Sequence, residues 1–359
     1  MGAVLNHDNP EELFIFCNHE YIPASITKFT LNLKKFTITN AEVAFNKIHS
    51  DSSLPLLKRF CSSSLYQKGE FGLIKDIYLT GEEFRNGRAF LLDIEEKVLH
   101  QIPALGNHSF ENIVMIDINM PDYTCCLIGD DYGKRPLFLY IGKRNYQSKN
   151  LLDQLGFGES YQKYSLCLDQ KNELNGLNYW AGIFKKIESD NEPYLFNRPE
   201  DICLNPNNKN QAFFSATNEG VYLIDIDKVQ NVQEGYPSEI SAKITKYDPY
   251  NKIRKPDNVL WNKRNEIFIQ EDCGDNSGIW KISFPKQNPE KIVVINNEHH
   301  NFHKSWETTG LIDITDYIKQ KSDNKKQYLL TNIQAHKVSK YLNNKKRSED
   351  GQMILICID

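Results

Sequence analysis

The chain has 359 residues, enough for one large all-β domain or for two ordinary domains. Its formal net charge of −4 gives no basic surface of the kind that binds polyanions, so we expect no nucleic-acid partner. It contains no uninterrupted apolar stretch of about 18 residues, and the sequence therefore predicts no membrane span. Aromatic residues make up 11% of the chain, which favours strands over a helical bundle.

The N-terminal region predicts two strands, over residues 13–20 and 25–33, and His19 lies near the end of the first. Each later copy of the same pattern has a further strand before these two. We therefore expect the N-terminal element to be incomplete. No basic segment followed by an apolar one occurs here, so the sequence predicts no signal peptide.

A pattern of three strand-like runs recurs four times after residue 60. Each copy opens beside a residue that can bind a metal ion, and these residues are Cys61, Glu111, Glu200 and Asp257. The second run of each copy ends in acidic residues, at Glu82–Glu83, Asp130–Asp131, Glu219 and Glu271–Asp272. From Glu82 to Asp130 the interval is 48 residues, and from Glu219 to Glu271 it is 52. A four-stranded propeller blade takes roughly 40–50 residues, so this spacing predicts one blade per copy.

The interval between the second and third copies is longer and contains an insertion over about residues 143–195. Its segment KNLLDQLGFGE predicts a short helix, and the insertion is the best candidate for a lid over the channel. Runs over 306–314, 328–336 and 353–359 form a last copy of the pattern. His336 lies at the end of its run, as His19 does in the N-terminal copy. A ring of sheets closes on itself to remove exposed strand edges. We predict an all-β fold, a single β-propeller domain over 1–359 with six blades, five or seven being the alternatives.

Acidic residues at the ends of the inner strands of a propeller face one another across the central channel. Carboxylates gathered in this way repel one another unless a cation lies between them. Their oxygens suit Ca²⁺, Mg²⁺ or Fe³⁺, whereas a thiolate among them favours iron. The alternative is that the acids only join blades through hydrogen bonds and that the thiol is a buried free cysteine. The predicted metal ligands are Cys61, Glu82, Glu83, Glu111, Glu200, Asp257, Glu271 and Asp272.

Three basic or titratable residues are predicted to assist catalysis. Arg198 precedes Glu200 by two residues, and a guanidinium group beside a metal site can bind a phosphate with two hydrogen bonds. His19 and His336 lie at matching strand ends, where an imidazole can bind a metal ion or a phosphate. The alternatives are an ion pair of Arg198 with an acid of a neighbouring blade, and structural roles for both histidines.

The segments RFCSSSL, YLTGEEF with GRAFLLD, ALGNHSFEN, GDD, FNRPED, PDNV, IQED, WETTGLID and NIQAH occur in this order. In these motifs the chain resembles the PhoX-type alkaline phosphatases and their relatives. The resemblance implies a six-bladed propeller with iron and calcium ions in its channel, where phosphomonoesters are cleaved. It implies that Cys61 is the thiolate ligand of iron and that the predicted acids are the other ligands. It also implies a periplasmic or secreted protein.

The function predicted from the sequence is metal-dependent phosphomonoester hydrolysis with Ca²⁺ and Fe³⁺ as cofactors. The cations would neutralise the phosphate oxygens of a small phosphorylated substrate. We expect the protein to be a monomer. Two alternatives stay open, namely a calcium-stabilised propeller that acts as a binding scaffold without catalysis, and a related hydrolase of phosphodiesters or phytate.

Overall fold

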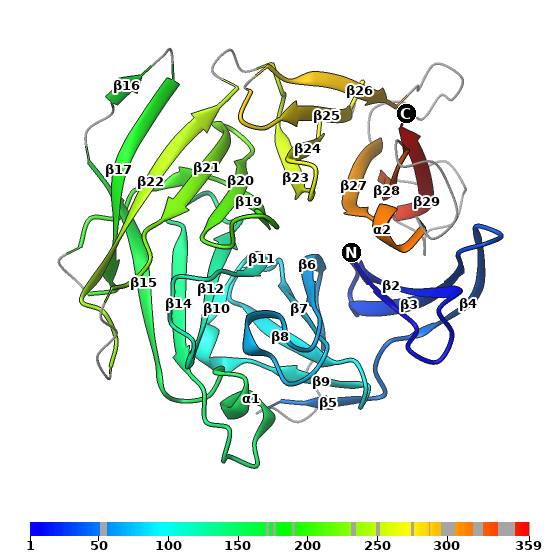
Figure 1. Ribbon diagram of the computed structural model, residues 1–359, viewed down its shortest axis with the longest axis horizontal. Helices are drawn as coiled ribbons and strands as arrows, with labels where there is room; N and C mark the ends of the chain where they lie inside the picture. The colour runs from blue at the N-terminus through cyan, green and yellow to red at the C-terminus, as the bar shows by residue number, and fades with distance from the viewer. Residues whose placement is uncertain are drawn as a thin grey trace.

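The computed structural model describes most of the chain. The described residues are 1–50, 56–169, 172–174, 177–188, 191–230, 235–248, 252–273, 276–286, 288–295, 306–318, 326–336 and 349–358. Nearly all regular structure in these ranges is antiparallel sheet, and the sheets are arranged like propeller blades around a central axis (Figure 1). The all-β, propeller-like fold predicted from the sequence is therefore confirmed.

The first half of the chain builds two sheets and begins a third. A four-stranded sheet contains β1 (Gly2–Leu5), β2 (Glu12–His19), β3 (Ser25–Asn32) and β4 (Thr37–Val43). A six-stranded sheet has the order β5 (Lys47–His49), β9 (Val98–Gln101), β8 (Gly87–Asp93), β7 (Ile77–Glu82) and β6 (Phe60–Tyr66), with β10 (Asn107–His108) on β8. The strands predicted over 13–20 and 25–33 are β2 and β3. A strand that the sequence did not predict, β1, precedes them and pairs with β2.

A ten-stranded sheet occupies the middle of the chain. It begins with β11 (Phe110–Met115), β12 (Tyr123–Asp130), β14 (Phe138–Lys143), β15 (Tyr161–Leu168) and β17 (Leu177–Lys186). It continues with β22 (Glu239–Tyr247), β21 (Gly220–Ile226), β20 (Gln211–Ala216) and β19 (Pro199–Leu204), and β16 (Asn172–Leu174) pairs with β17. β13 (Lys134–Arg135) pairs with β18 (Phe196–Asn197) in a separate ribbon. The insertion expected over 143–195 supplies β15, β16, β17 and the short helix α1 (Leu151–Gln154), and β17 joins the two halves of this sheet.

The last two sheets complete the arrangement. One contains β23 (Pro256–Trp261), β24 (Glu266–Glu271), β25 (Gly278–Ser283) and β26 (Glu290–Val294). The other contains β27 (Trp306–Asp313), β28 (Gln327–His336) and β29 (Glu349–Ile358), with the helix α2 (Thr315–Ile318) beside them. Two short 3₁₀ helices, η1 (Glu70–Gly72) and η2 (Pro103–Leu105), lie in loops. None of the described helices has the length and apolar character needed to cross a membrane.

The apolar cores lie between the sheets, as expected for blades that pack face to face. Along β11 and β12 every residue is buried, because both faces of these strands are covered by neighbouring elements. The strands nearest the central axis lie against one another, β6 against β11, β11 against β19 (the two end strands of the ten-stranded sheet), and β19 against β23. This packing fixes the positions of the strand ends that carry the candidate site.

Candidate metal centre

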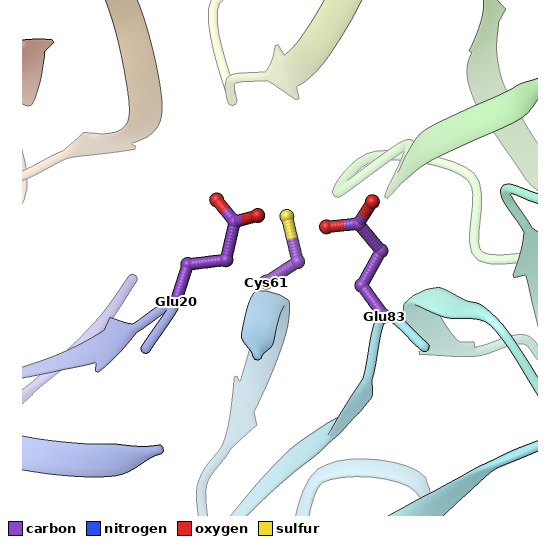
Figure 2. A group of neighbouring side chains, drawn as sticks. All are labelled: Glu20, Cys61 and Glu83. Atoms are coloured by element: carbon purple, nitrogen blue, oxygen red, sulfur yellow. The ribbon is translucent and has the colours of Figure 1, made fainter. Parts of the chain in front are cut away.

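Side chains from four sheets converge at one end of the inner strands. Three groups of ligand atoms occur in the described part of the chain, and the atoms of each group lie within 4.8 Å of one another. The groups are Glu20, Cys61 and Glu83; Glu83, Glu111 and Asp131; and Glu111, Glu200 and Asp257. Since Glu83 and Glu111 each belong to two groups, the seven residues form one continuous set, which we call the acidic cluster. Figure 2 shows the carboxylates of Glu20 and Glu83 pointing toward each other with the thiol of Cys61 between them.

Four members of the acidic cluster occupy the same position in an inner strand. Each is the second residue of its strand: Cys61 in β6, Glu111 in β11, Glu200 in β19 and Asp257 in β23. In each strand the pairing register shifts directly after the first residue, which marks a β-bulge. A bulge turns a side chain out of the regular alternation and is common beside functional sites. The structure therefore brings together the four residues that open the repeated pattern in the sequence.

The other three acids of the cluster each follow the second strand of a sheet. Glu20 follows β2, Glu83 follows β7 and Asp131 follows β12. The backbone N–H of Glu83 donates to the carbonyl of Arg59 at 2.8 Å, which fixes this corner against the start of β6. Glu20 and Asp131 are absent from the ligands predicted from the sequence. Their shared place after a second strand is the signal that could have identified them.

Glu82, a predicted ligand, lies outside the acidic cluster. It is the last residue of β7, and its neighbour Glu83 points to the opposite side because strand side chains alternate. Its carboxylate accepts hydrogen bonds from Arg88, at 2.6 Å from Nη2 and 2.8 Å from Nε, and from the backbone N–H of Lys58 at 2.8 Å. This buried ion pair connects β7 with β8, and Glu82 belongs to none of the three groups of ligand atoms.

Glu271 has a similar structural environment at the end of β24. Its carboxylate pairs with Nζ of Lys291 at 2.7 Å and accepts the backbone N–H of Arg254 at 2.9 Å. Asp272 follows β24 directly, in the place that Glu83 has after β7. Burial and the charge of Glu200 raise the pKa of Asp257 most, and the charge of Asp272 adds to them. Asp272 lies outside the three groups of ligand atoms. The structure thus places Glu271 in an ion pair and Asp272 at the edge of the acidic cluster.

Two arginines each bind two carboxylates of the acidic cluster. Arg198 donates from Nε and Nη2 to the two oxygens of Asp131, at 2.8 and 2.7 Å, and its Nη2 lies 3.0 Å from Glu200. Arg59, which was not among the predicted site residues, pairs with Glu83 at 3.0 Å and with Glu20. Both have positive φ and come two residues before a cluster residue. Each arginine side chain is 39% exposed, so the guanidinium groups also reach solvent.

The charges of the acidic cluster are not balanced by these two arginines. Six carboxylates face two guanidinium groups, and neither Glu111 nor Asp257 forms an ion pair with a described Lys or Arg. Burial and the charges of Glu200 and Glu83 raise the pKa of Glu111 well above its ordinary value. Burial and the charge of Glu20 raise the pKa of Glu83 to about 8, against the opposing effect of Arg59. Such acids ionise together only when cations lie between them, so the donor set fits metal ions.

Cys61 contributes the one thiol of the acidic cluster. Its Sγ lies 3.4 Å from Oε1 of Glu111, within hydrogen-bonding distance for a thiol. Burial and the charges of Glu111 and Glu83 raise the pKa of the thiol well above its ordinary value. The same surroundings that keep the thiol protonated would favour a thiolate once a cation is bound, because a metal ion reverses the local charge.

The structure describes the side chain of His19 but only the backbone of His336, the two histidines predicted to assist catalysis. Nε2 of His19 lies 2.7 Å from Oγ1 of Thr27, and burial lowers the pKa of the imidazole. His19 borders the cavity that also contains Glu20 and Cys61. The backbone of His336 ends β28 and pairs with Glu349, and its side chain lies outside the described part of the structure.

Hydrogen bonds behind the acidic cluster connect the inner strands of the sheets. Ser62 Oγ donates to Oε1 of Glu111 at 2.7 Å and accepts from Nδ2 of Asn258 at 3.0 Å. Asn112 donates to Oδ1 of Asp201 at 2.6 Å, and the backbone N–H of Val259 donates to the other oxygen at 3.1 Å. Each of the four side chains belongs to the residue directly after a cluster residue: Ser62, Asn112, Asp201 and Asn258. They hold the bulges in register, so the ligand positions are set before any ion binds.

Comparisons with known proteins concern the fold of the chain. No family model matches the sequence. Among curated proteins the chain is similar to "Cln5-like protein 2" of Dictyostelium discoideum, with 27% identity over 157 residues. That match covers 39% of this chain and 46% of the relative, so it spans about half the length of that protein.

Among solved structures the chain is similar to "Pseudomonas fluorescens PhoX in complex with vanadate, a transition state analogue". The superposition covers 98% of this chain and 87% of that chain with a TM-score of 0.68. The chain has a PhoX-like fold. At 11% sequence identity this likeness shows the fold alone. It confirms the PhoX-like fold that the resemblance implied, and the number of blades stays a prediction.

Proposed function

We propose that this PhoX-like protein is a metal-dependent phosphomonoesterase whose site is the acidic cluster. The observation that carries the proposal is the excess of carboxylates, six against two guanidinium groups, within three overlapping sets of ligand atoms. Its PhoX neighbour is described with vanadate, a transition-state analogue, which supports a phosphatase over other hydrolases. We further propose six blades, with the ten-stranded sheet counted as two that β17 joins, and calcium and iron as the bound metals.

The residues that would hold the ions are the seven of the acidic cluster, with Asp272 at its edge. Bound cations would supply positive charge to the phosphoryl oxygens and lower the barrier to attack at phosphorus. The thiol of Cys61 makes iron the fitting metal for the group formed with Glu20 and Glu83. The all-carboxylate group of Glu111, Glu200 and Asp257 suits calcium.

Arg198 would orient the substrate. Its guanidinium is held from one side by Asp131 and Glu200 and is partly exposed on the other. A group fixed in this way can donate to a phosphate oxygen without first losing side-chain freedom. Arg59 has the same relation to Glu20 and Glu83 on the other side of the cluster. The two arginines would thus select a doubly charged phosphate monoester over a less charged ester.

The test is hydrolysis of 4-nitrophenyl phosphate by the purified protein, before and after chelation and after return of Ca²⁺ and Fe³⁺. Metal analysis of the same samples identifies the bound ions. We expect iron and calcium together, loss of activity on chelation and recovery on reconstitution. If the protein contains calcium alone and hydrolyses nothing, the proposed enzymatic activity is wrong and a calcium-stabilised binding scaffold is favoured. Faster turnover of bis(4-nitrophenyl) phosphate would favour a phosphodiesterase.

A further inference from the structure

Three acids of the acidic cluster are each followed in the chain by an exposed aromatic residue. The pairs are Glu20 with Tyr21, Glu83 with Phe84 and Asp131 with Tyr132. The three aromatic residues are 39%, 40% and 45% exposed. Each acid follows the second strand of a sheet, so the turn that comes next places an aromatic residue beside the cluster. Aromatic side chains beside a few polar groups are typical of sites for small molecules.

Two of these turns also bring arginines together. The guanidinium carbon of Arg85 lies 6.0 Å from the ring centre of Tyr132, and that of Arg135 lies 5.3 Å from it. Arg85 comes two residues after Glu83, and Tyr132 directly follows Asp131. These two acids belong to one group of ligand atoms, so the turns meet at the edge of the cluster. We call Arg85, Tyr132 and Arg135 the basic rim.

The basic rim is joined to the arginine that would orient the phosphate. The backbone N–H of Arg198 donates to the carbonyl of Gly133, the residue directly after Tyr132, at 2.7 Å. The strand β13, which ends at Arg135, pairs with β18, which ends one residue before Arg198. A substrate whose phosphate is held by Arg198 would therefore have its organic part near the basic rim.

The basic rim has an excess of positive charge in the described part of the chain. Arg85 is exposed and forms no ion pair with a described Asp or Glu. Arg135 lies 3.5 Å from Asp130, whose carboxylate also lies 3.0 Å from Nδ1 of His108. The other acids of these two turns are Glu82, which is paired within its sheet, and two cluster acids that pair with arginines. Metal cations at the cluster would add to the attraction for an anion and would not cancel it.

We propose that the basic rim binds an anionic group on the organic part of the substrate, so that the protein prefers phosphomonoesters with a further carboxylate or phosphate over neutral ones. This inference rests on the proposed function and adds its substrate class. The phosphate to be cleaved lies at the cluster, and the second anion accepts hydrogen bonds from Arg85 and Arg135. The exposed rings of Phe84 and Tyr132 contact the carbon skeleton between the two anions.

The experiment compares kcat/KM for 4-carboxyphenyl phosphate and 4-carbamoylphenyl phosphate, which have nearly the same shape and differ by one negative charge. The neutral amide makes the phenol a slightly better leaving group, so intrinsic reactivity runs against the expected preference. We expect the metal-loaded protein to prefer the carboxylate ester by roughly fivefold, the size of an exposed charge–charge effect. The difference should lie in KM, because the rim binds a part of the substrate that does not react, and it should shrink as salt is added.

Arg85→Gln gives the test variant, since it removes one charge of the basic rim and breaks no ion pair in the described part of the chain. The preference for the carboxylate ester should largely disappear. Arg264→Gln is the control, because it removes the same charge from an exposed residue that lines a cavity away from the cluster. It should leave the preference intact. Equal kcat/KM values for the two esters, or a preference that Arg85→Gln does not reduce, would overturn the assignment of the basic rim.

Binding of analogues separates this inference from the proposed function. The phosphonates 4-carboxybenzylphosphonate and 4-carbamoylbenzylphosphonate cannot be hydrolysed, and calorimetry on the metal-loaded protein measures their affinities. Tighter binding of the carboxylate that is lost in Arg85→Gln supports the basic rim even if neither ester is hydrolysed, and the missing hydrolysis then contradicts the proposed function alone. Hydrolysis of both esters with equal affinities for the two phosphonates leaves the proposed function standing and overturns the basic rim. Binding of neither phosphonate overturns the basic rim as well.

Discussion

Two sets of buried acids in this protein have opposite surroundings. Glu82 and Glu271 end the second strands β7 and β24, and each pairs with a cation of its own sheet, Arg88 or Lys291. Glu111 and Asp257 lie at the start of inner strands, face other carboxylates across the axis and pair with no described Lys or Arg. Because a lone charge is costly to bury, an acid with a partner in its sheet serves the fold, and an acid facing other acids requires a cation from outside.

The adjacent residues Glu82 and Glu83 fall on opposite sides of this contrast, one in a structural ion pair and one in the acidic cluster. Glu82 and Glu83 are consecutive, yet Glu82 bonds Arg88 within the sheet and Glu83 joins Glu20 and Cys61 at the axis. The end of the strand separates them, because side chains alternate and the backbone turns after β7. One sheet thus contributes a structural ion pair and a candidate ligand from two neighbouring positions.

The largest effect should come from Glu111→Gln, which keeps the shape of the side chain and removes the charge shared by two ligand groups. We expect kcat to fall on the order of a hundredfold or more and the metal content to drop. In chelator the same variant should melt at a higher temperature than the wild type, since it removes like-charge repulsion. Activity assays, metal analysis and thermal melts check the three parts. A variant with full metal content and full activity would contradict the assignment of Glu111.

Glu82→Gln is the matched control from the structural set. It leaves the guanidinium of Arg88 without its charge partner, and breaking a buried pair of this kind costs roughly 2–4 kcal/mol in the free energy of unfolding. Urea denaturation at neutral pH measures this loss. At a temperature where the variant stays folded, its metal content should equal that of the wild type. Loss of metal without loss of stability would place Glu82 among the ligands after all.

The pH dependence of stability should separate the metal-free from the metal-bound protein. The pKa of Glu83 rises from its ordinary value of 4.5 to about 8, and the pKa values of Glu111, Glu200 and Asp257 rise in the same direction. Since the folded state binds these protons more tightly, the metal-free protein is most stable below about pH 4.5 with respect to these groups and loses that stability as pH rises toward 8.

Thermal melts in chelator should therefore shift down by several degrees between pH 5 and pH 8. Saturating Ca²⁺ should abolish or reverse this trend, because ions bind the ionised carboxylates and release their protons. The variant Glu111→Gln should show a smaller shift in chelator than the wild type. A melting temperature in chelator that rises with pH over this range would contradict the raised pKa values.

The sequence predicts much of this arrangement for a physical reason. Glu111, Glu200 and Asp257 lie just before apolar runs that form inner strands, and Cys61 has the matching place in the first clear copy. Position in the repeated pattern therefore predicts position at the axis. The sequence does not reveal the ion pairs of Glu82 and Glu271, because a shift of one residue changes the direction of a side chain and their cationic partners come from strands paired later in the chain. The joining of β15 to β22 through β17 depends on pairing of outer edges, which periodicity does not specify.

Ser62→Ala should give the smallest effect, because it removes a hydrogen bond that positions the candidate ligand Glu111 and leaves Glu111 itself in place. It removes the 2.7 Å hydrogen bond to Glu111 and the acceptor for Asn258. We expect metal affinity to fall roughly tenfold and the free energy of unfolding to drop by ~1 kcal/mol. Ser64→Ala is the control, since Ser64 is on the same strand as Ser62 and its hydroxyl donates to Asn112 of β11 at 3.0 Å instead of to a cluster residue. Metal titrations should separate the two variants while urea denaturation gives similar losses. Equal metal affinities would mean that the bulge of β11 alone positions Glu111.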